Sequence, residues 1–430
     1  MSTRIQAPKG TTDLLPIDAP KWHFIERIAR DTAALYHYGE IRTPIFEYTD
    51  LFHRGVGETS DVVSKETYTF TDRDGSSITL RPEGTAGVVR AVIENGFLND
   101  QGARAKVYYI GPNFRHERPQ KGRYRQHHQF GVEAFGVADP EQDVECIQLQ
   151  MDFYRRCGLR DLSLRVNSLG DAESKGRYRE ALVTFIGPKA ANLSEDSQRR
   201  LTTNPLRILD SKDPRDVAAV QGAPPAVESL SEKSRRHFDR VTALLAAMGL
   251  PFTVDGALVR GFDYYTDTLW EVTAGGLGSQ NAVGGGGRYD NLVEQLGGRP
   301  TPGVGFGSGL ERLLIALEAQ GATPPSVEPP LVWLVQDGPA AREFNLRLLA
   351  DLRAASIAAD TDLSGRSFKA QMKLIDREKP AYSVVVRDDE LASGNVTVKD
   401  LKAGQQTVVP QADVVTHLRE RVRSTAHAPV

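Results

Sequence analysis

The chain has 430 residues, of which 40% are hydrophobic and 25% are charged, and its formal net charge is -3. This length predicts two or three domains, and the small net charge excludes a general attraction to nucleic acid, so any such binding needs a local patch. No apolar run approaches the ~18 residues that span a bilayer, and the N-terminus lacks an apolar signal core, which predicts a cytoplasmic protein with no membrane partner. Neither Cys146 nor Cys157 has the neighbours of a structural zinc site.

The first part of the chain predicts an α+β domain. Residues 19–38 carry apolar side chains at helical spacing, opened by Asp18 and Pro20, and we expect one amphipathic helix closed by Gly39. Strand-like runs follow at 77–82, 106–111 and 125–136. Strands joined by hairpins predict an antiparallel sheet.

The rest of the chain changes character twice. Between about 171 and 250 it is polar and helical in pattern, broken by prolines, so we expect a helical insertion before strand signals return. Residues 321–330 contain four prolines and predict a stiff linker. Beyond it, alternating strands and helices predict a small α/β domain. We therefore expect a first domain at 1–325 and a second at 331–430.

A basic segment lies between Arg104 and His128. It holds seven lysines or arginines and three histidines against a single acidic residue, Glu117. A solvated loop would account for these charges, but their position between two strands favours a polyanion site. Alternation along a strand places Arg115 and Glu117 on one face. Neither GxxxxGK[ST] nor GxGxxG occurs, so an ATP site must be of another kind.

Two strands combine polar groups with glycine. Gln129, Gly131 and Glu133 share one face, which leaves room for a small ligand. Between 303 and 309, glycine at every second position leaves one face bare, so something flat or bulky should lie there. Ser308 and Glu311 have the spacing of a capping box.

Three other places suggest ligand contacts. Arg312, in the first turn of a predicted helix, opposes the helix dipole unless an anion lies nearby. In Arg81-Pro82-Glu83-Gly84-Thr85 we expect Thr85 to cap the next helix, which leaves Glu83 for a ligand. The runs LVRGFDYY (258–265) and GGGGRYD (284–290) place an arginine and tyrosines beside backbone that can approach a ligand closely.

These segments resemble known motifs. RTPIFEYTD, FRHERPQKGRYRQHHQFGVE and GVGFGSGLERLLIALE resemble the three motifs of class II aminoacyl-tRNA synthetases, and VRGFDYYTDTLWEV with GGGGRYDNLVEQLGG resembles the signatures of the histidyl-tRNA synthetase family. The resemblance covers nearly the whole chain and is weakest at 171–250. It implies a class II antiparallel sheet flanked by helices, the helical insertion and an anticodon-binding α/β domain. It also implies a ligase that uses ATP to convert L-histidine to histidyl-adenylate and then charges histidine tRNA.

The resemblance assigns roles to particular residues. Arg115 and Arg260 hold the α-phosphate, Arg312 holds the γ-phosphate, and Glu117 faces the adenine. The histidine pocket comprises Glu83, Gly84, Thr85, Gln129, Glu133, Arg260, Tyr264, Tyr265 and Tyr289. Within it Glu133 and Tyr265 read the imidazole nitrogens, since neutral imidazole has one donor and one acceptor.

The resemblance also implies partners and a cofactor. Arg118, Gln120 and Arg125 meet the tRNA acceptor end. Mg²⁺ accompanies ATP on the β- and γ-phosphates, with no ligand assigned among the side chains. The first motif forms the interface of a homodimer.

Two alternatives share the fold but not the activity. A regulatory subunit of ATP phosphoribosyltransferase binds without aminoacylating, and both the complete set Arg115, Glu117, Arg260 and Arg312 and the C-terminal domain argue against it. A kinase-like eukaryotic regulator with a synthetase-like domain would need a longer chain.

Overall fold

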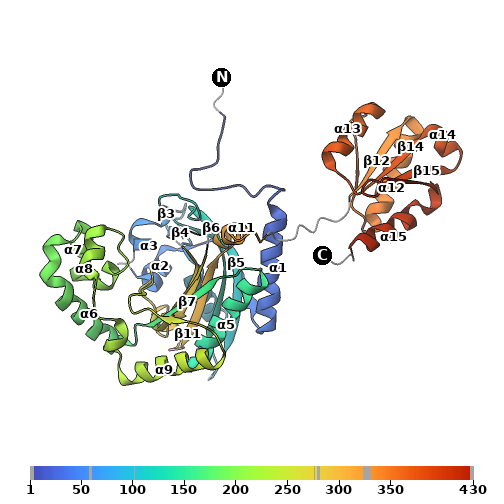
Figure 1. The fold of residues 1–430 in the computed structure, drawn as a ribbon. Helices are drawn as coiled ribbons and strands as arrows, with labels where there is room; N and C mark the ends of the chain where they lie inside the picture. Colours follow the sequence, from blue (N-terminus) through green and yellow to red (C-terminus); the bar gives the residue numbers. More distant parts are fainter. Residues whose placement is uncertain are drawn as a thin grey trace. The chain divides into compact units, whose positions relative to one another are not determined.

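The computed structural model describes residues 4–57, 61–100, 102–275, 277, 281–322 and 331–426. It divides into two compact units, Met1–Ser326 and Val327–Val430 (Figure 1). Most of the predicted linker, residues 323–330, lies outside the described residues. Within the described ranges, no helix is both long and apolar enough to cross a membrane.

An eight-stranded sheet forms the centre of the first unit. Its order is β1-β5-β6-β11-β10-β9-β7-β8, and the described neighbours are antiparallel except for the edge pairs β1–β5 and β7–β8. The strands are β1 (Gly39–Glu40), β5 (Ala105–Phe114), β6 (Gln126–Phe135), β7 (Leu162–Ser168), β8 (Thr253–Val254), β9 (Thr266–Ala274), β10 (Ala282–Arg288) and β11 (Gly303–Gly309). A smaller sheet has the order β2-β4-β3, with β2 (Phe46–Tyr48), β3 (Tyr68–Thr71) and β4 (Ser77–Leu80). The predicted antiparallel sheet is confirmed.

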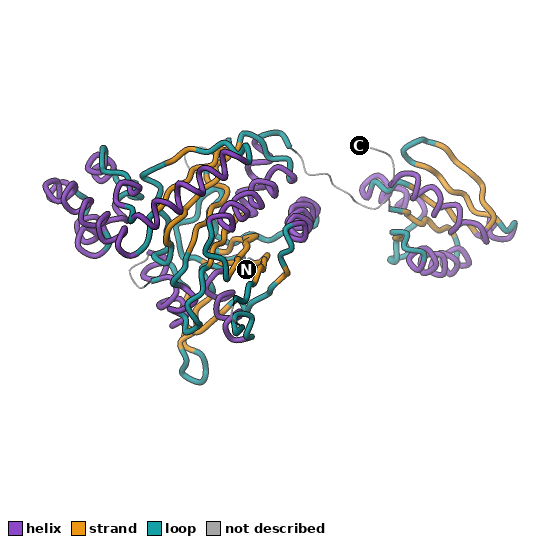
Figure 2. Tube along the Cα trace, turned by 90° about the horizontal axis from the view of Figure 1, so that it is seen from below, coloured by secondary structure: helices purple, strands orange, loops and turns teal. Residues whose placement is uncertain are grey.

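Helices surround this sheet (Figure 2). Outside the segment 171–250 they are α1 (Ala19–Leu35), α2 (Thr49–Val56), α3 (Asp61–Lys65), α4 (Thr85–Glu94), α5 (Pro140–Arg156), α10 (Leu292–Gln295) and α11 (Leu310–Ala319). The helix α1 ends at Leu35, earlier than predicted, because His37 takes a φ of 61° and the Tyr38 N–H turns back to the Ala33 carbonyl. Gly39 begins β1 instead of closing the helix.

The segment predicted as an insertion is helical. It contains α6 (Ala172–Ile186), η1 (Gly187–Asn192), α7 (Glu195–Thr203), η2 (Pro205–Ile208), α8 (Pro214–Val220), η3 (Ala226–Ser229) and α9 (Glu232–Ala247). In Figure 1, α6, α7 and α8 gather at one side of the first unit, beside the sheet. The side chains of Asp171, Ser194 and Ser231 cap α6, α7 and α9.

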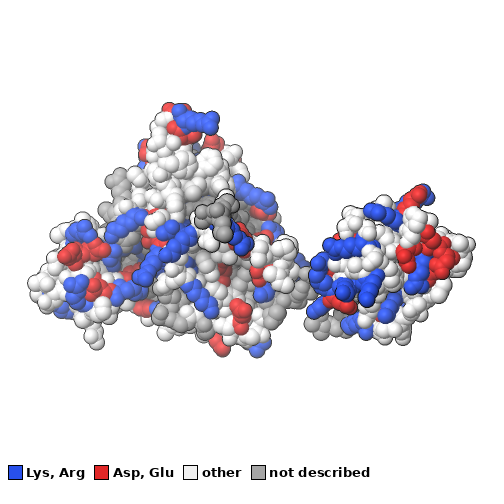
Figure 3. Space-filling view, turned by 90° about the horizontal axis from the view of Figure 1, so that it is seen from above, with Lys and Arg blue, Asp and Glu red and all other residues white. Residues whose placement is uncertain are grey.

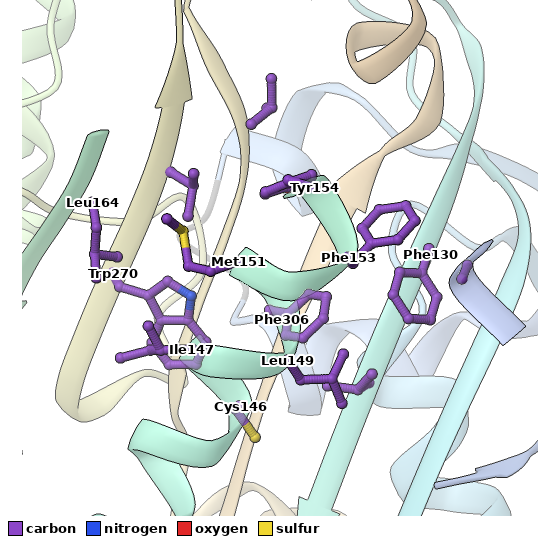
Figure 4. Packing of buried hydrophobic residues seen from close by; sticks show 14 of the residues in the cluster. Phe130, Cys146, Ile147, Leu149, Met151, Phe153, Tyr154, Leu164, Trp270 and Phe306 are labelled. Atoms are coloured by element: carbon purple, nitrogen blue, oxygen red, sulfur yellow. The ribbon is translucent and has the colours of Figure 1, made fainter. Parts of the chain in front are cut away.

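The two faces of the sheet differ, as β6 illustrates. Phe130, Val132 and Ala134 are buried in the core beneath α5, where Phe130 meets Phe153 edge-on with ring centroids 4.8 Å apart (Figure 4). Side chains alternate along a strand, so Gln129 and Glu133 point to the opposite face. Gln129 and Glu133 therefore lie on the face of β6 away from α5.

Arg288, at the end of the glycine-rich β10, does not face a ligand as the sequence suggested. Its Nε donates to Asp143 Oδ1 on α5 at 3.0 Å, and its Nη1 donates to Asp290 Oδ1 at 3.1 Å. The side chains of Arg288 and Asp143 are fully buried, and His237 Nε2 lies 2.6 Å from Asp143 Oδ2. This arginine ties the sheet to α5, and Asp143 in turn contacts His237 of α9.

The second unit has a five-stranded sheet in the order β13-β12-β14-β15-β16. Its strands are β12 (Val332–Asp337), β13 (Ala359–Thr361), β14 (Tyr382–Arg387), β15 (Asn395–Asp400) and β16 (Gln405–Pro410). Its helices are α12 (Pro339–Ala354), α13 (Phe368–Glu378), α14 (Asp388–Ala392), η4 (Gln411–Asp413) and α15 (Val414–Ala426). The strands β13, β12 and β14 are parallel, which confirms the predicted α/β pattern. On the visible face of this unit, acidic and basic side chains gather in separate places (Figure 3).

We predict that Arg288→Met lowers the free energy of unfolding by about 3 to 5 kcal/mol, because it leaves the buried Asp143 without its main partner. Arg240→Met is the matched control. Arg240 pairs with Glu141, which lies on α5 like Asp143, but both side chains of this pair are more than half exposed. That change should cost about 1 kcal/mol or less. Urea unfolding followed by tryptophan fluorescence measures both, and equal losses would contradict a structural role for Arg288.

Candidate active site

Glu83 caps the helix α4. Its two carboxylate oxygens accept from the backbone N–H groups of Thr85 at 2.6 Å and Ala86 at 2.9 Å. The prediction that Thr85 caps this helix is therefore wrong, because α4 begins at Thr85 itself and the carboxylate two residues earlier reaches the free N–H groups. Gly84 lies between them, with the ring of Tyr109 directly against it. Burial raises the pKa of Glu83.

Glu133 lies at the bottom of the site with 1% of its surface exposed. Thr85 Oγ1 donates to Glu133 Oε1 at 2.7 Å, and the Tyr289 hydroxyl donates to Oε2. Burial raises the pKa of this carboxyl to about 8, although these hydrogen bonds oppose the rise. Glu133 therefore holds a proton for much of the time at neutral pH, which a carboxylate in water would not.

The bare face of β11 provides the space for this carboxyl. A Cβ on Gly305 would collide with the Glu133 carboxylate, and one on Gly303 would collide with the Tyr289 ring. Gln129 lies above Gly307, 3.4 Å from where a Cβ would stand. The bulky group that the sequence required over this face is thus the protein's own set of polar side chains.

The predicted capping box of Ser308 and Glu311 is wrong. The helix α11 begins at Leu310, and Gly309 at its N-cap offers no side chain. Ser308 still belongs to β11 and points to the α5 face, where its Oγ lies 2.8 Å from the Tyr154 hydroxyl. Glu311 accepts instead from the backbone N–H of His128 at 2.9 Å. Ser308 therefore attaches β11 to α5, and Glu311 attaches α11 to β6.

Three predicted tyrosines form one buried aromatic group. The ring centroids of Tyr264 and Tyr265 are 4.7 Å apart, and those of Tyr264 and Tyr289 are 5.7 Å apart. Burial first, and then Tyr265 and the carboxylates of Glu83 and Glu133, raise the pKa of Tyr264. The structure therefore brings the predicted tyrosines and both carboxylates into one pocket.

Sequence reasoning missed two residues of this pocket. Tyr109 is buried between Gly84 and Gly131, and a Cβ on either glycine would strike its ring. Asn113 Nδ2 donates to Gln129 Oε1 at 2.7 Å and so orients that amide. Both lie on β5, where alternation places residues 109, 111 and 113 on one face opposite Gln129 and Gly131. The pairing of β5 with β6 was the signal that could have found them.

The arginines predicted to bind phosphates lie at the edges of this pocket. The Arg115 Nε donates to the Pro82 carbonyl at 2.9 Å, and its guanidinium lies 5.4 Å from the centre of the Phe262 ring. Arg312 donates to the carbonyls of Gly122 and Ala282, each at 3.0 Å. Burial and the nearby cation Arg123 lower the pKa of the Arg312 guanidinium, against the opposing carboxylate of Glu117. An anion would be favoured among these groups.

The third of these arginines, Arg260, borders the bare part of β10. Its Nη1 donates to Glu271 Oε2 at 3.1 Å, and a Cβ on Gly285 would stand 2.9 Å from that nitrogen. Arg165 pairs with the other oxygen of Glu271 and with Asp255. Arg260 is therefore held at the pocket by a carboxylate shared between two cations.

A hairpin connects β5 to β6 next to these arginines. The strand β5 ends at Phe114, so the prediction that a strand carries Arg115 and Glu117 on one face is wrong. Glu117 instead accepts a hydrogen bond from Arg123 Nη1 at 3.1 Å. The backbones of Gln120 and Arg123 form an isolated antiparallel β-bridge across the turn. A cavity of about 600 Å³ opens here, and it is lined by Lys65, His116, Glu117, Arg118, Gln120 and Arg123. Arg125, the other residue predicted to meet tRNA, donates its backbone N–H to Gly10 at 2.7 Å.

Comparisons with known proteins find relatives along nearly the whole chain. A family model described as histidyl-tRNA synthetase matches residues 10–313, and one described as an anticodon binding domain matches residues 331–421. A histidine–tRNA ligase from Geobacillus sp. strain WCH70 is 48% identical over 97% of this chain and 99% of its own length. Another, from Moorella thermoacetica, is 50% identical over 97% of this chain and 98% of its own length.

Solved structures are also similar. Apo histidyl-tRNA synthetase from S. aureus has a TM-score of 0.81 and 38% identity, covering 97% of this chain and 100% of that chain. A protein from Bacillus halodurans described as an ATP phosphoribosyltransferase regulatory subunit/histidyl-tRNA synthetase has a TM-score of 0.64 at 21% identity, over 90% of this chain and 99% of that chain. The second likeness concerns the fold alone.

The raised pKa of Glu133 predicts a pH dependence of stability. The folded protein binds an extra proton between the ordinary value of 4.5 and about 8, so this carboxyl stabilises the fold below pH 4.5 and loses that effect as the pH rises to 8. Wild type should therefore lose stability relative to Glu133→Gln between pH 5 and pH 8.5 in urea unfolding. Glu141→Gln is the control. The hydrogen bond from Arg240 lowers the pKa of Glu141, so the effect of Glu141 on stability changes with pH only below this range. A constant difference between wild type and Glu133→Gln would contradict the assignment.

Proposed function

The chain belongs to the histidyl-tRNA synthetase family, and we propose that it converts L-histidine and ATP to histidyl-adenylate and then transfers histidine to the 3′ end of histidine tRNA. The observation that carries this function is the buried Glu133, which lies among tyrosines and near the arginines for which we propose phosphate binding. The regulatory-subunit alternative has less support. The similarity to the Bacillus halodurans protein is 21% in sequence and indicates a shared fold without indicating a shared activity. In addition, residues 331–421 match an anticodon binding domain.

We propose that Glu133 and Tyr265 bind the two imidazole nitrogens. A carboxyl with a pKa of about 8 can donate its proton to the acceptor nitrogen of imidazole or accept a hydrogen bond from the donor nitrogen. The phenol of Tyr265 can accept from or donate to the other ring nitrogen. Glu83, Thr85 and Gln129 are placed to receive the α-amino group, while Tyr264 and Tyr289 close the pocket. Other amino acids would leave buried polar groups unpaired, which can give about 10⁴-fold discrimination without an editing site.

Activation requires chiefly positioning and charge neutralisation. The histidine carboxylate attacks the α-phosphate and displaces pyrophosphate, while Arg115 and Arg260 would stabilise the growing charge. Arg312 would hold the γ-phosphate and Glu117 would face the adenine. Mg²⁺ prefers oxygen ligands and is usually held by one or two carboxylates together with the phosphates of the substrate. We therefore propose that the ion would accompany ATP and would neutralise charge on its β- and γ-phosphates.

The macromolecular partners follow from two surfaces. The acceptor end of tRNA would meet the β5–β6 hairpin at Arg118, Gln120 and Arg125, and the anticodon would meet the second unit.

We also propose a homodimer, because the small sheet leaves Phe46 52% and Tyr48 65% exposed, with Phe70 on the far strand 48% exposed. Exposed aromatic groups on the two outer strands of one small sheet indicate a surface that another copy can cover. A cytoplasmic location stays a prediction from the sequence.

Histidine-dependent exchange of pyrophosphate into ATP tests the proposed function. We expect exchange in the presence of Mg²⁺ with histidine and none with the other common amino acids, because only imidazole satisfies both Glu133 and Tyr265. Tyr265→Phe should raise the KM for histidine while leaving the KM for ATP nearly unchanged. An enzyme that shows no exchange with histidine would contradict the proposal.

Arg260→Ala should lower kcat by about 10² to 10³, the usual effect of removing one donor from a developing oxyanion, with smaller changes in either KM. Arg165→Ala is the matched control, because Arg165 pairs with the same carboxylate, Glu271, from the strand β7. If an unpaired Glu271 alone caused the loss, both variants would lose activity equally. Equal losses, or a loss below about tenfold in Arg260→Ala, would reject the role of Arg260.

A further inference from the structure

The loop at 260–265 carries three proposed site residues but little regular structure. It lies on the connection from β8 to β9, and residues 258–265 contain only turns, bends and coil. Arg260, Tyr264 and Tyr265 nevertheless need fixed positions if they are to bind phosphate and imidazole. Backbone groups in such a loop must find partners outside the sheet ladder.

Arg207, from η2 in the helical segment, holds the first half of this loop. Its Nη2 donates to the Gly261 carbonyl at 2.5 Å and lies 3.5 Å from Asp263 Oδ1. Asn204 Nδ2 donates to the same carboxylate oxygen at 3.1 Å. The Arg207 side chain is only 10% exposed, so these contacts are shielded from solvent.

Lys175, from α6, holds the other end of the loop. Its Nζ donates to the Tyr265 carbonyl, immediately before β9. Burial lowers the pKa of Lys175, while the carboxylates of Asp263 and Asp267 oppose that change. The ammonium group therefore holds the chain at the point where the loop meets β9.

The helical segment and the histidine pocket also share one hydrophobic core. Tyr178, Leu182 and Ile208 belong to the same buried cluster as Tyr264 and Tyr265. The backbones of Asp267 and Leu169 are joined as well, by a hydrogen bond of 3.0 Å from the Leu169 N–H. The packing around Tyr264 and Tyr265 therefore includes side chains from these helices.

We propose that the helical segment at 172–247 is a positioning element for histidine, and that Lys175 and Arg207 hold the 260–265 loop in the form that binds the amino acid. The inference rests on the proposed function and adds a role for residues that touch neither substrate. Without either cation, fewer molecules would have the loop in the binding form, and the apparent affinity for histidine falls in proportion to that fraction. The affinity for ATP, which depends mainly on Arg115 and Arg312, should fall less.

Pyrophosphate exchange by Arg207→Met and Lys175→Met tests this inference. Each variant should raise the KM for histidine about tenfold while changing the KM for ATP by less than about twofold. Arg179→Met is the matched control, because Arg179 also donates to a backbone carbonyl, that of Thr202 at 2.7 Å, but within the helical segment. It should leave both constants near the wild-type values.

A conservative variant separates positioning from general damage. Arg207→Lys keeps a cation that can reach the Gly261 carbonyl, so it should recover part of the histidine affinity that Arg207→Met loses. If Arg207→Met does not fold, the comparison of Lys175→Met with Arg179→Met decides the question. Equal effects on histidine and ATP, or variants that match the Arg179→Met control, would overturn the inference. Wild-type protein without histidine-dependent exchange would instead overturn the proposed function.

Discussion

The site is organised around a carboxyl group, Glu133, that the fold removes almost completely from water. Such burial is costly unless hydrogen bonds compensate, and Thr85 and Tyr289 supply them. The neighbouring strand can approach only because Gly305 has no side chain to collide with the carboxylate. The glycine-rich strand, the buried tyrosines and the helix α4 can therefore be understood as the surroundings that this one group needs.

The same arrangement separates the two halves of the proposed substrate site. The carboxyl pocket lies where β6 is fully covered, while Arg115 and the hairpin lie beyond the end of β5, where the backbone leaves the sheet. A small side chain can thus be read by buried groups, and charged phosphates can be met by arginines that keep partial access to water. Arg312 holds two segments of the arginine region together, since it donates to Gly122 in the hairpin and to Ala282 at the start of β10.

Patterns of alternation and spacing predicted the antiparallel sheet, the C-terminal α/β unit and the shared polar face of β6. Local motifs predicted the roles of single residues less well, because a side chain can form its hydrogen bonds with a residue that is distant in sequence. Ser308 and Glu311 have capping-box spacing, yet Tyr154 and His128 engage them. Arg288 resembled a ligand contact but forms a buried ion pair with Asp143, 145 residues away in sequence. Tyr109 and Asn113 could be placed in the pocket only through the register of β5 against β6.

The central claim is that Glu133 binds the imidazole of histidine, and nitrogen NMR of ring-¹⁵N-labelled L-histidine bound to the protein tests it directly. Free imidazole titrates near pH 6.5, whereas a ring hydrogen-bonded to a buried carboxyl shares its proton with that group. The bound ring nitrogens should therefore titrate away from that value in wild type, and Glu133→Gln should change their shifts or abolish binding. Ring nitrogens that titrate as in free histidine, unaffected by Glu133→Gln, would contradict the account.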